Sequence, residues 1–422
     1  MRKLLIFLIM SIFPVAAFCA QDSDIPKATD NHVLTLKDCY RLALKESEII
    51  ASDAEKIKEA EARFLEAFGT ILPQISFSRS NVWRNSKRSP TYNKSFEQKF
   101  VFKQALFSGF KEFAAIAGGK FETRQRENEK LRAQQLLLVD VSDAFYLLME
   151  EREDLKVLKT IKDAFLNRIS ELKDRVDLGR SRTSEVVSTE TQLYSLEDQI
   201  ESATNQEQVA LELLEFLVGR PVNDITDAEI IPSLSPEAEY LAKASTRADV
   251  LAANFAWKVD EKGIAIAKSG FLPQVNLEGD YYAHRSSAPT DGRFDTLLTV
   301  NVPIFEGTTT YGQVKEATAR ARESELLFKR AERLAAQDIH DAYLNARSDL
   351  SRTVILDKAL KSAEKNYSLQ LEDYKLNVVN NLDVLTAIQD LEDVRRSFIH
   401  ISYESKRFYW QLLAAAGEIN PE

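Results

Sequence analysis

The sequence has few of the residues that break helices or cross-link chains. Its 422 residues include only 13 glycines, 11 prolines and 2 cysteines. An all-β or a disordered protein would have a different composition, whereas 44% hydrophobic and 28% charged residues favour helices.

Long hydrophobic runs are also absent. The apolar run at residues 4–13 is too short to span a membrane as a helix, and no other stretch approaches about 18 apolar residues. Basic residues precede this run and small residues follow it, an order typical of a signal peptide over residues 1–20. Cys19 lies at the expected cleavage site and is a candidate for lipidation, although Phe18 stands where a small residue is expected. Without Cys19, Cys39 is alone, so the exported chain depends on its core or on assembly rather than on a disulfide.

Motifs for catalysis or for cofactor binding are lacking as well. The four histidines have no metal-ligand partner at useful spacing, and GGKF (residues 118–121) lacks the first glycine and the hydroxyl residue of a P-loop. The sequence therefore predicts a protein that is not an enzyme and holds no metal or cofactor. The net charge of −10 argues against nucleic-acid partners.

What the sequence does contain is two copies of one unit, because three motifs recur at an interval of 198 or 200 residues. They are LPQ at 72–74 and 272–274, ALFSG and PIFEG at 105–109 and 303–307, and VDLGRSRTSEVV and YKLNVVNNLDVL at 176–187 and 374–385. We therefore divide the mature chain into a first repeat with its linker, residues 21–235, and a second repeat, residues 236–422.

A heptad pattern ends each copy in the same phase. Mainly apolar residues step by three and four from Val186 to Leu217 and again from Val384 to Ala415. This period of 3.5 residues predicts helices that pack as coiled coils. The expected elements are helix 35–70, strands 74–84 and 95–107, helices 111–176 and 186–218, then helix 236–270, strands 274–284 and 294–305, and helices 309–374 and 384–416.

The four strands alternate in polarity. Their length of about 10–13 residues suits a tilted transmembrane strand, although a soluble antiparallel sheet with one buried face has the same pattern. Strands in lipid must close into a barrel, and four are too few, so the chain is expected to oligomerise. The apolar positions of the second strand in each copy are Phe96, Phe100, Phe102 and Leu106, and Phe294, Leu298, Val300 and Val302; the opposite face of the first holds Glu97, Lys99 and Lys103.

In order and spacing, the duplicated plan, the LPQ and LFSG/IFEG motifs and RADV (residues 247–250) resemble TolC-like outer-membrane efflux proteins. The resemblance implies a mixed α/β membrane protein: a homotrimer whose 12-stranded β-barrel in the outer membrane continues as an α-helical barrel across the periplasm. Pro73 and Pro273 would mark the helix-to-strand junctions.

The implied function is a passive exit duct for efflux or type I secretion. Its partners would be outer-membrane lipid, a periplasmic adaptor (membrane fusion) protein and an inner-membrane pump, for which the RND and ABC types both remain open. The alternative from another class is a soluble periplasmic coiled-coil adaptor or scaffold, which predicts no lipid-facing strand surface.

The resemblance also places a gate at the two tight turns. Tyr374 and Asp383 match a tyrosine and an aspartate that tie the aperture shut, and Glu185 is the corresponding acid of the first copy. Val379 and Thr386 stand where the family has an arginine and a second aspartate. We expect Arg180 or Arg182 to substitute by pairing with Asp383 or Glu185, the alternative being that these charges are solvated or contact the adaptor. The residues expected to contact the adaptor are Leu178, Gly179, Leu376 and Asn377.

Overall fold

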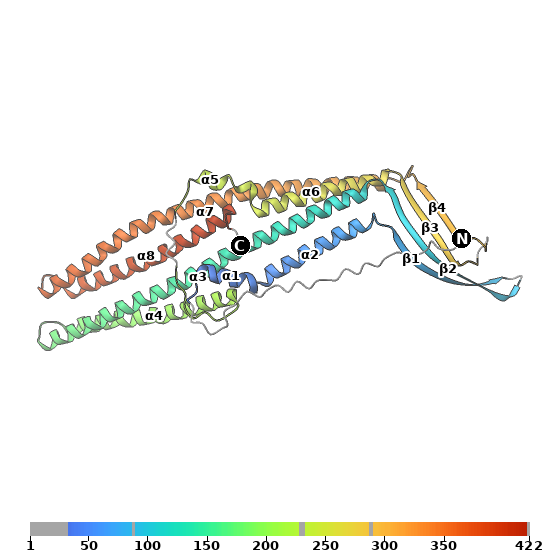
Figure 1. Cartoon of the computed structure of the whole chain (residues 1–422). Coiled ribbons are helices and arrows are strands. Elements are labelled where there is room, and N and C mark those ends of the chain that lie inside the picture. The colour runs from blue at the N-terminus through green and yellow to red at the C-terminus, as the bar shows by residue number, and fades with distance from the viewer. Residues whose placement is uncertain (1–32, 87–88, 228–232, 287–289, 420–422) are drawn as a thin grey trace.

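The protein is a long rod of helices with a four-stranded sheet at one end (Figure 1). The computed structural model describes residues 33–86, 89–227, 233–286 and 290–419, so the expected signal peptide and Cys19 lie outside the described residues. Two helices of 67 residues, α3 (Lys111–Asp177) and α7 (Thr309–Lys375), run from the sheet to the far end of the rod. At a rise of about 1.5 Å per residue, each is roughly 100 Å long. Within the described part of the chain, no helix has both the length and the apolar character that crossing a membrane requires.

The predicted duplication is confirmed in the helices. α4 (Thr183–Val218) and α8 (Asn381–Ala416) are both 36 residues long, and each begins 198 residues from its counterpart, as α3 and α7 do. Most positions of the predicted heptad are buried along α4, including Val186, Leu193 and Leu214. The coiled-coil period therefore describes how these helices pack.

The first expected helix is wrong as a single element. It is two helices, α1 (Leu36–Glu46) and α2 (Glu48–Gly69), separated at Ser47. Ser47 has extended backbone angles, and its hydroxyl accepts the backbone N–H of Ile50 at the start of α2. Ser47 caps a second helix, but it stands in a run of helix-forming residues, so the sequence alone did not indicate the break.

The expected helix 236–270 is likewise interrupted. It consists of α5 (Glu237–Leu241), a 3₁₀ turn (Ala244–Thr246), α6 (Ala248–Lys268) and a second 3₁₀ turn (Ser269–Phe271). Arg247 stands before α6 with extended backbone angles. Its buried guanidinium pairs with Asp249 at 2.7 Å and with Asp338 of α7 at 3.0 Å.

The sheet is antiparallel in the order β1-β2-β3-β4. Its strands are β1 (Gln74–Ser86), β2 (Ser89–Ser108), β3 (Gln274–His284) and β4 (Phe294–Asn301). β2 begins at Ser89 rather than at residue 95, and β4 ends at Asn301 rather than at 305. Pro303 explains the early end of β4, because proline has no N–H for the strand ladder; the first repeat has Ala105 at this position, and β2 continues.

The two faces of the sheet differ in chemistry, as predicted. Phe77, Phe100, Tyr281 and Phe294 form a row across all four strands, and each is 48–66% exposed. The opposite face carries cross-strand ion pairs between β2 and β3, which join Lys99 to Asp280 and Lys103 to Glu278. No described helix covers the aromatic row, which in water would leave four neighbouring aromatic side chains exposed.

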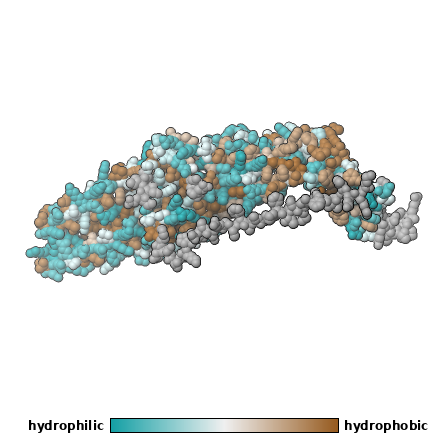
Figure 2. Space-filling model, viewed as in Figure 1, coloured by the Kyte–Doolittle hydropathy of each residue, from teal (hydrophilic) through white to brown (hydrophobic). Residues whose placement is uncertain are grey.

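Hydrophobic surface also gathers where the helices meet the sheet (Figure 2). Phe110, Phe271, Ile304 and Phe305 are exposed near this junction. The other end of the rod is more hydrophilic in the same view (Figure 2).

Candidate functional site

The far end of the rod consists of two helical turns with the same backbone geometry. We call residues 178–182 and 376–380, with the adjoining helix ends, the tips. Gly179 has φ +69° and its counterpart Asn377 has φ +57°. In both tips the next N–H closes the turn onto a carbonyl five residues earlier, Arg180 onto Arg175 at 2.8 Å and Val378 onto Asp373 at 2.9 Å. Glycine and asparagine are the residues that adopt this left-handed conformation most readily.

The outer surface of the tips is partly apolar. Leu178 and Leu376 are exposed, as are Val378 and Leu382. Gly179 and Asn377 are also exposed. Their contact with an adaptor stays a prediction.

Asp383 and Glu185 lie in equivalent places but have different partners. The Asp383 carboxylate accepts the backbone N–H of Asn380 at 3.0 Å, and the Asn380 side chain accepts the N–H of Asp383, so the two residues form a capping box at the start of α8. Glu185 accepts a hydrogen bond from the Ser181 hydroxyl at 2.7 Å.

Arg180 and Arg182 are exposed, and neither forms an ion pair with Asp383 or Glu185 within the described chain. Their predicted pairing with Asp383 or Glu185 stays a prediction. At the opposite end, Pro73 directly precedes β1 and Pro273 directly precedes β3.

Tyr374, by contrast, is buried between two arginines of the other repeat. The guanidinium carbon of Arg168 lies 3.5 Å from the centroid of the Tyr374 ring, and that of Arg175 lies 4.3 Å away. Both arginines are on α3, seven residues apart, so they lie two turns apart on one face. A guanidinium over an aromatic face is attracted by the ring quadrupole, and more so when water is excluded.

Arg168 also reaches the start of α8. Only 3% of Arg168 is exposed; its Nε donates to the Asn381 side chain at 2.8 Å, and its Nη1 pairs with Glu171 at 2.8 Å. The Asn381 amide in turn donates to Thr189 of α4 at 3.3 Å. This network joins α3, α4 and α8 close to the tips.

Arg175, two turns nearer the end of α3, also binds an asparagine of the second repeat and Glu171. Its Nη1 donates to the Asn377 side chain at 3.3 Å, and its Nη2 lies 3.2 Å from Glu171. The single carboxylate of Glu171 thus neutralises part of the charge of both arginines.

We name the group of Arg168, Glu171, Arg175, Tyr374, Asn377 and Asn381 the tip cluster. Sequence reasoning identified Tyr374 but missed the arginines and Glu171. The available signal was a charged residue, Arg168, within a helical face that also carries Phe165 and Leu172, both of which are buried.

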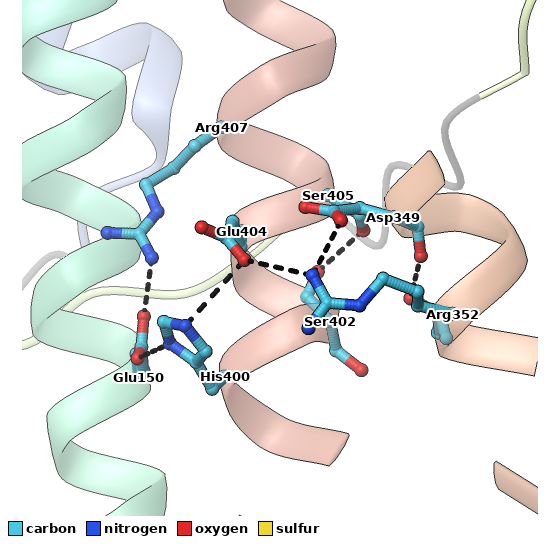
Figure 3. Close-up of polar contacts among 9 residues, drawn as sticks. Glu150, Asp349, Arg352, His400, Ser402, Glu404, Ser405 and Arg407 are labelled. Carbon is cyan, nitrogen blue, oxygen red and sulfur yellow. Dashed lines mark hydrogen bonds and ion pairs between the residues drawn. The ribbon is translucent and has the colours of Figure 1, made fainter. Parts of the chain in front are cut away.

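Further along the rod, polar contacts continue between α3 and α8. The carboxylate of Glu150 on α3 accepts a hydrogen bond from Arg407 Nη2 at 2.8 Å, and His400 Nδ1 lies 2.6 Å from the same carboxylate (Figure 3). His400 Nε2 lies 3.6 Å from Glu404, which in turn faces Arg352 of α7 (Figure 3). The carboxylate of Glu150 therefore holds two side chains of the second repeat.

Two further contacts complete what we call the α3–α8 seam. Arg396 binds Asp154 through two nitrogens at 2.7 and 3.0 Å. Near the C-terminus of α8, Arg132 donates to the Ala414 carbonyl at 2.7 Å. The seam between the two repeats is thus rich in charged hydrogen bonds, which are stronger than neutral ones.

The fold and these contacts define an elongated, internally duplicated subunit with a membrane-type hairpin sheet at one end and paired coiled-coil tips at the other. The profile of the family described as outer membrane efflux protein matches residues 242–418, most of the second repeat. The TolC outer membrane protein of Vibrio cholerae is 21% identical over 402 residues, which cover 92% of this chain and 91% of that protein. The TolC of Escherichia coli K12 is 19% identical over 395 residues, covering 87% and 78%.

Solved structures agree on the fold. The crystal structure of the outer membrane protein VceC of Vibrio cholerae matches with a TM-score of 0.81 at 19% identity, over 90% of this chain and 96% of VceC. The matches confirm the resemblance to TolC-like outer-membrane efflux proteins that the sequence predicts.

Proposed function

We propose that this chain is the subunit of an outer-membrane exit duct with a large periplasmic helical part. The duct serves a tripartite efflux system or type I secretion, and it is gated at the tips. Three copies form it, as the resemblance implies. The matched profile and the TolC relatives support this proposal.

The observation that carries the proposal is the sheet itself. One face is apolar and uncovered, the other carries ion pairs, and β1 and β4 are edge strands without a partner strand among the described residues. An open edge is too costly in lipid, where no water satisfies the backbone. Further copies of the chain supply the missing neighbours, and the charged face then lines the interior.

The junction between helices and strands supports assembly independently. A Cβ on Gly109 would lie 2.8 Å from the Ser269 carbonyl oxygen and 2.9 Å from Leu272, because the two repeats pack closely here. The counterpart Gly307 has nothing within 4 Å. By the repeat, the segment 69–72 of a second copy is the missing partner at Gly307.

The helices present the same asymmetry. Phe216 on α4 is 81% exposed, whereas its counterpart Ala414 on α8 is 2% exposed and contacts α3. On α7, Ile355 is 64% exposed, whereas its counterpart Val157 on α3 is 8% exposed. We infer that α4 of one copy packs against α7 of the next, as α8 packs against α3 within the chain.

The partners follow from the two ends of the rod. The sheet contacts outer-membrane lipid, and the exposed apolar residues of the tips meet a periplasmic adaptor. Because the sequence contains no nucleotide-binding motif, an inner-membrane pump of the RND or the ABC type supplies the energy. A soluble adaptor or scaffold, the alternative function, would leave the aromatic row facing water and is disfavoured on that ground.

The test is planar-bilayer conductance of the purified mature protein beside Asp383→Ala. We expect small channels from the wild type and wider channels from the variant, because the copies of Asp383 would no longer contribute to the closed aperture. Asn380→Ala is the matched control, since it removes the same capping box but keeps the carboxylate. Failure to enter the bilayer would overturn the duct; equal conductance of wild type and Asp383→Ala would overturn only the place of Asp383 in the gate.

A further inference from the structure

We propose that Arg168 and Arg175 lock the α7–α8 hairpin onto α3 by stacking on the Tyr374 ring, so that the flat ring, not its hydroxyl, is the latch of each chain. The role as a latch rests on the proposed duct function. The contacts themselves lie within one chain.

The geometry favours the ring over the hydroxyl. Both guanidiniums lie within 4.3 Å of the ring centroid. Among the described residues, the Tyr374 hydroxyl has no hydrogen-bond partner, whereas those of Tyr40 and Tyr282 donate to a carbonyl and a carboxylate. The attraction in this cluster therefore acts through the ring face.

Two cations on one ring repel each other, and the cluster contains the group that offsets this. Glu171 pairs with Arg168 at 2.8 Å and with Arg175 at 3.2 Å. Asn381 accepts one further N–H of Arg168, and Asn377 accepts one of Arg175. Each arginine thus bonds the second repeat twice, once through the ring and once through an asparagine.

The tip cluster also has features that would allow the hairpins to separate. Arg168 Nη2 is buried without a hydrogen-bond partner, so the packed cluster leaves one donor unsatisfied. Arg175 and Asn377 lie nearer to the end of the rod, where water has access. A buried donor without a partner destabilises the closed state, and separation of the hairpins gives that donor water.

The repeat shows that the latch occurs once per chain. The counterparts of Arg168 and Arg175 on α7 are Asn366 and Asp373, and the counterpart of Tyr374 on α3 is Val176. The equivalent place between copies therefore has no arginine and no ring. Each chain holds its own two tips together, independently of its neighbours.

The experiment compares Tyr374→Phe with Tyr374→Leu. Phenylalanine keeps the ring face, and we expect it to keep the tips closed; leucine keeps the apolar volume only. We expect leucine to raise the ratio of open to closed tips about tenfold, the effect of losing a desolvated cation–π contact. Arg175→Gln should act in the same direction, and the two changes together should have less than the sum of their separate effects, because both remove the contact between Arg175 and the ring.

The control is Lys173→Gln. Lys173 lies between the two arginines on α3 but pairs with Glu190 of α4 and touches no part of the tip cluster. The duct should behave as the wild type in this variant.

Two readouts separate the latch from the duct. The first is bilayer conductance. The second is the distance between nitroxide labels on Leu178→Cys and Leu376→Cys, measured within one labelled chain diluted among unlabelled chains. If the wild type forms no channel, the duct fails while the label distance still decides the latch. A longer distance in Tyr374→Phe, or an unchanged distance in Tyr374→Leu, would overturn the latch.

Discussion

At the scale of single residues, the two repeats form the same backbone turn at the tips with different side chains. The tips need a residue with positive φ, and the chain uses Gly179 in one and Asn377 in the other. The N-cap of the helix that follows is Arg182 in the first repeat, without a side-chain cap, and Asn380 in the second, with a capping box. The backbone is therefore repeated, while the contacts that stabilise it are not.

This difference predicts unequal stability of the two tips. Asn380→Ala should destabilise the start of α8 by about 1 kcal/mol, because it leaves backbone N–H groups without an acceptor. Arg182→Ala, the matched change in the first repeat, removes no cap and should change little. Hydrogen exchange of the amides of Leu382 and Asp383 measures the effect. Equal exchange rates in wild type and Asn380→Ala would show that the capping box does not stabilise this helix.

At the scale of elements, the strands were predictable in character and the long helices in extent. Alternation in the sequence identified both faces of the sheet, because side chains of a strand point to opposite sides in turn. The heptad located α4 and α8 to within a few residues, since the buried seam imposes its period on the sequence. The expected bounds of α3 and α7 also agree to within a residue.

The sequence did not reveal structural features that depend on caps or on contacts between distant residues. Ser47 and Arg247 interrupt runs of helix-forming residues, and each break is stabilised by a cap or by a distant ion pair. The tip cluster was missed for a related reason. Arg168 and Tyr374 are 206 residues apart, and only the packing of α3 against the α7–α8 hairpin brings them together.

The sheet provides a prediction at this scale from two adjacent residues of β1. Phe77→Lys places a charge in the aromatic row and should reduce folding in lipid by about 2–4 kcal/mol if it lies near the membrane midplane. Ser78→Lys places the same charge on the opposite face, beside Lys99, and should be tolerated far better. Insertion into vesicles, followed by the mobility shift of the folded protein, measures both. Equal insertion of the two variants would mean that the aromatic row does not face lipid.

At the scale of the whole molecule, the duplication produces two kinds of seam. The α3–α8 seam within the chain is polar, with Glu150 bound to Arg407 and Asp154 bound to Arg396. At the equivalent seam between copies, the counterpart of Arg407 is the exposed Val209 and that of Glu150 is the exposed Ser348. The counterparts of Asp154 and Arg396 are Arg352 and Asp198, again a base and an acid. We therefore expect contacts between copies to lack the ion pair at Val209 and Ser348, and to be less sensitive to salt there than the contact between the two repeats.

The most direct test of the account asks whether copies join through this second seam. The measurement is oxidative cross-linking of the mature protein that carries Val209→Cys and Ser348→Cys, the positions equivalent to Arg407 and Glu150. Cys39 does not interfere, because it is buried and burial raises the pKa of its thiol to about 12.

We expect a ladder of covalent products that ends at three chains, since each α4 then links to the α7 of the next copy until the ring closes. Either cysteine alone should leave single chains. Cross-linking confined to one chain, products that grow without limit, or none from a membrane-inserted sample would contradict it.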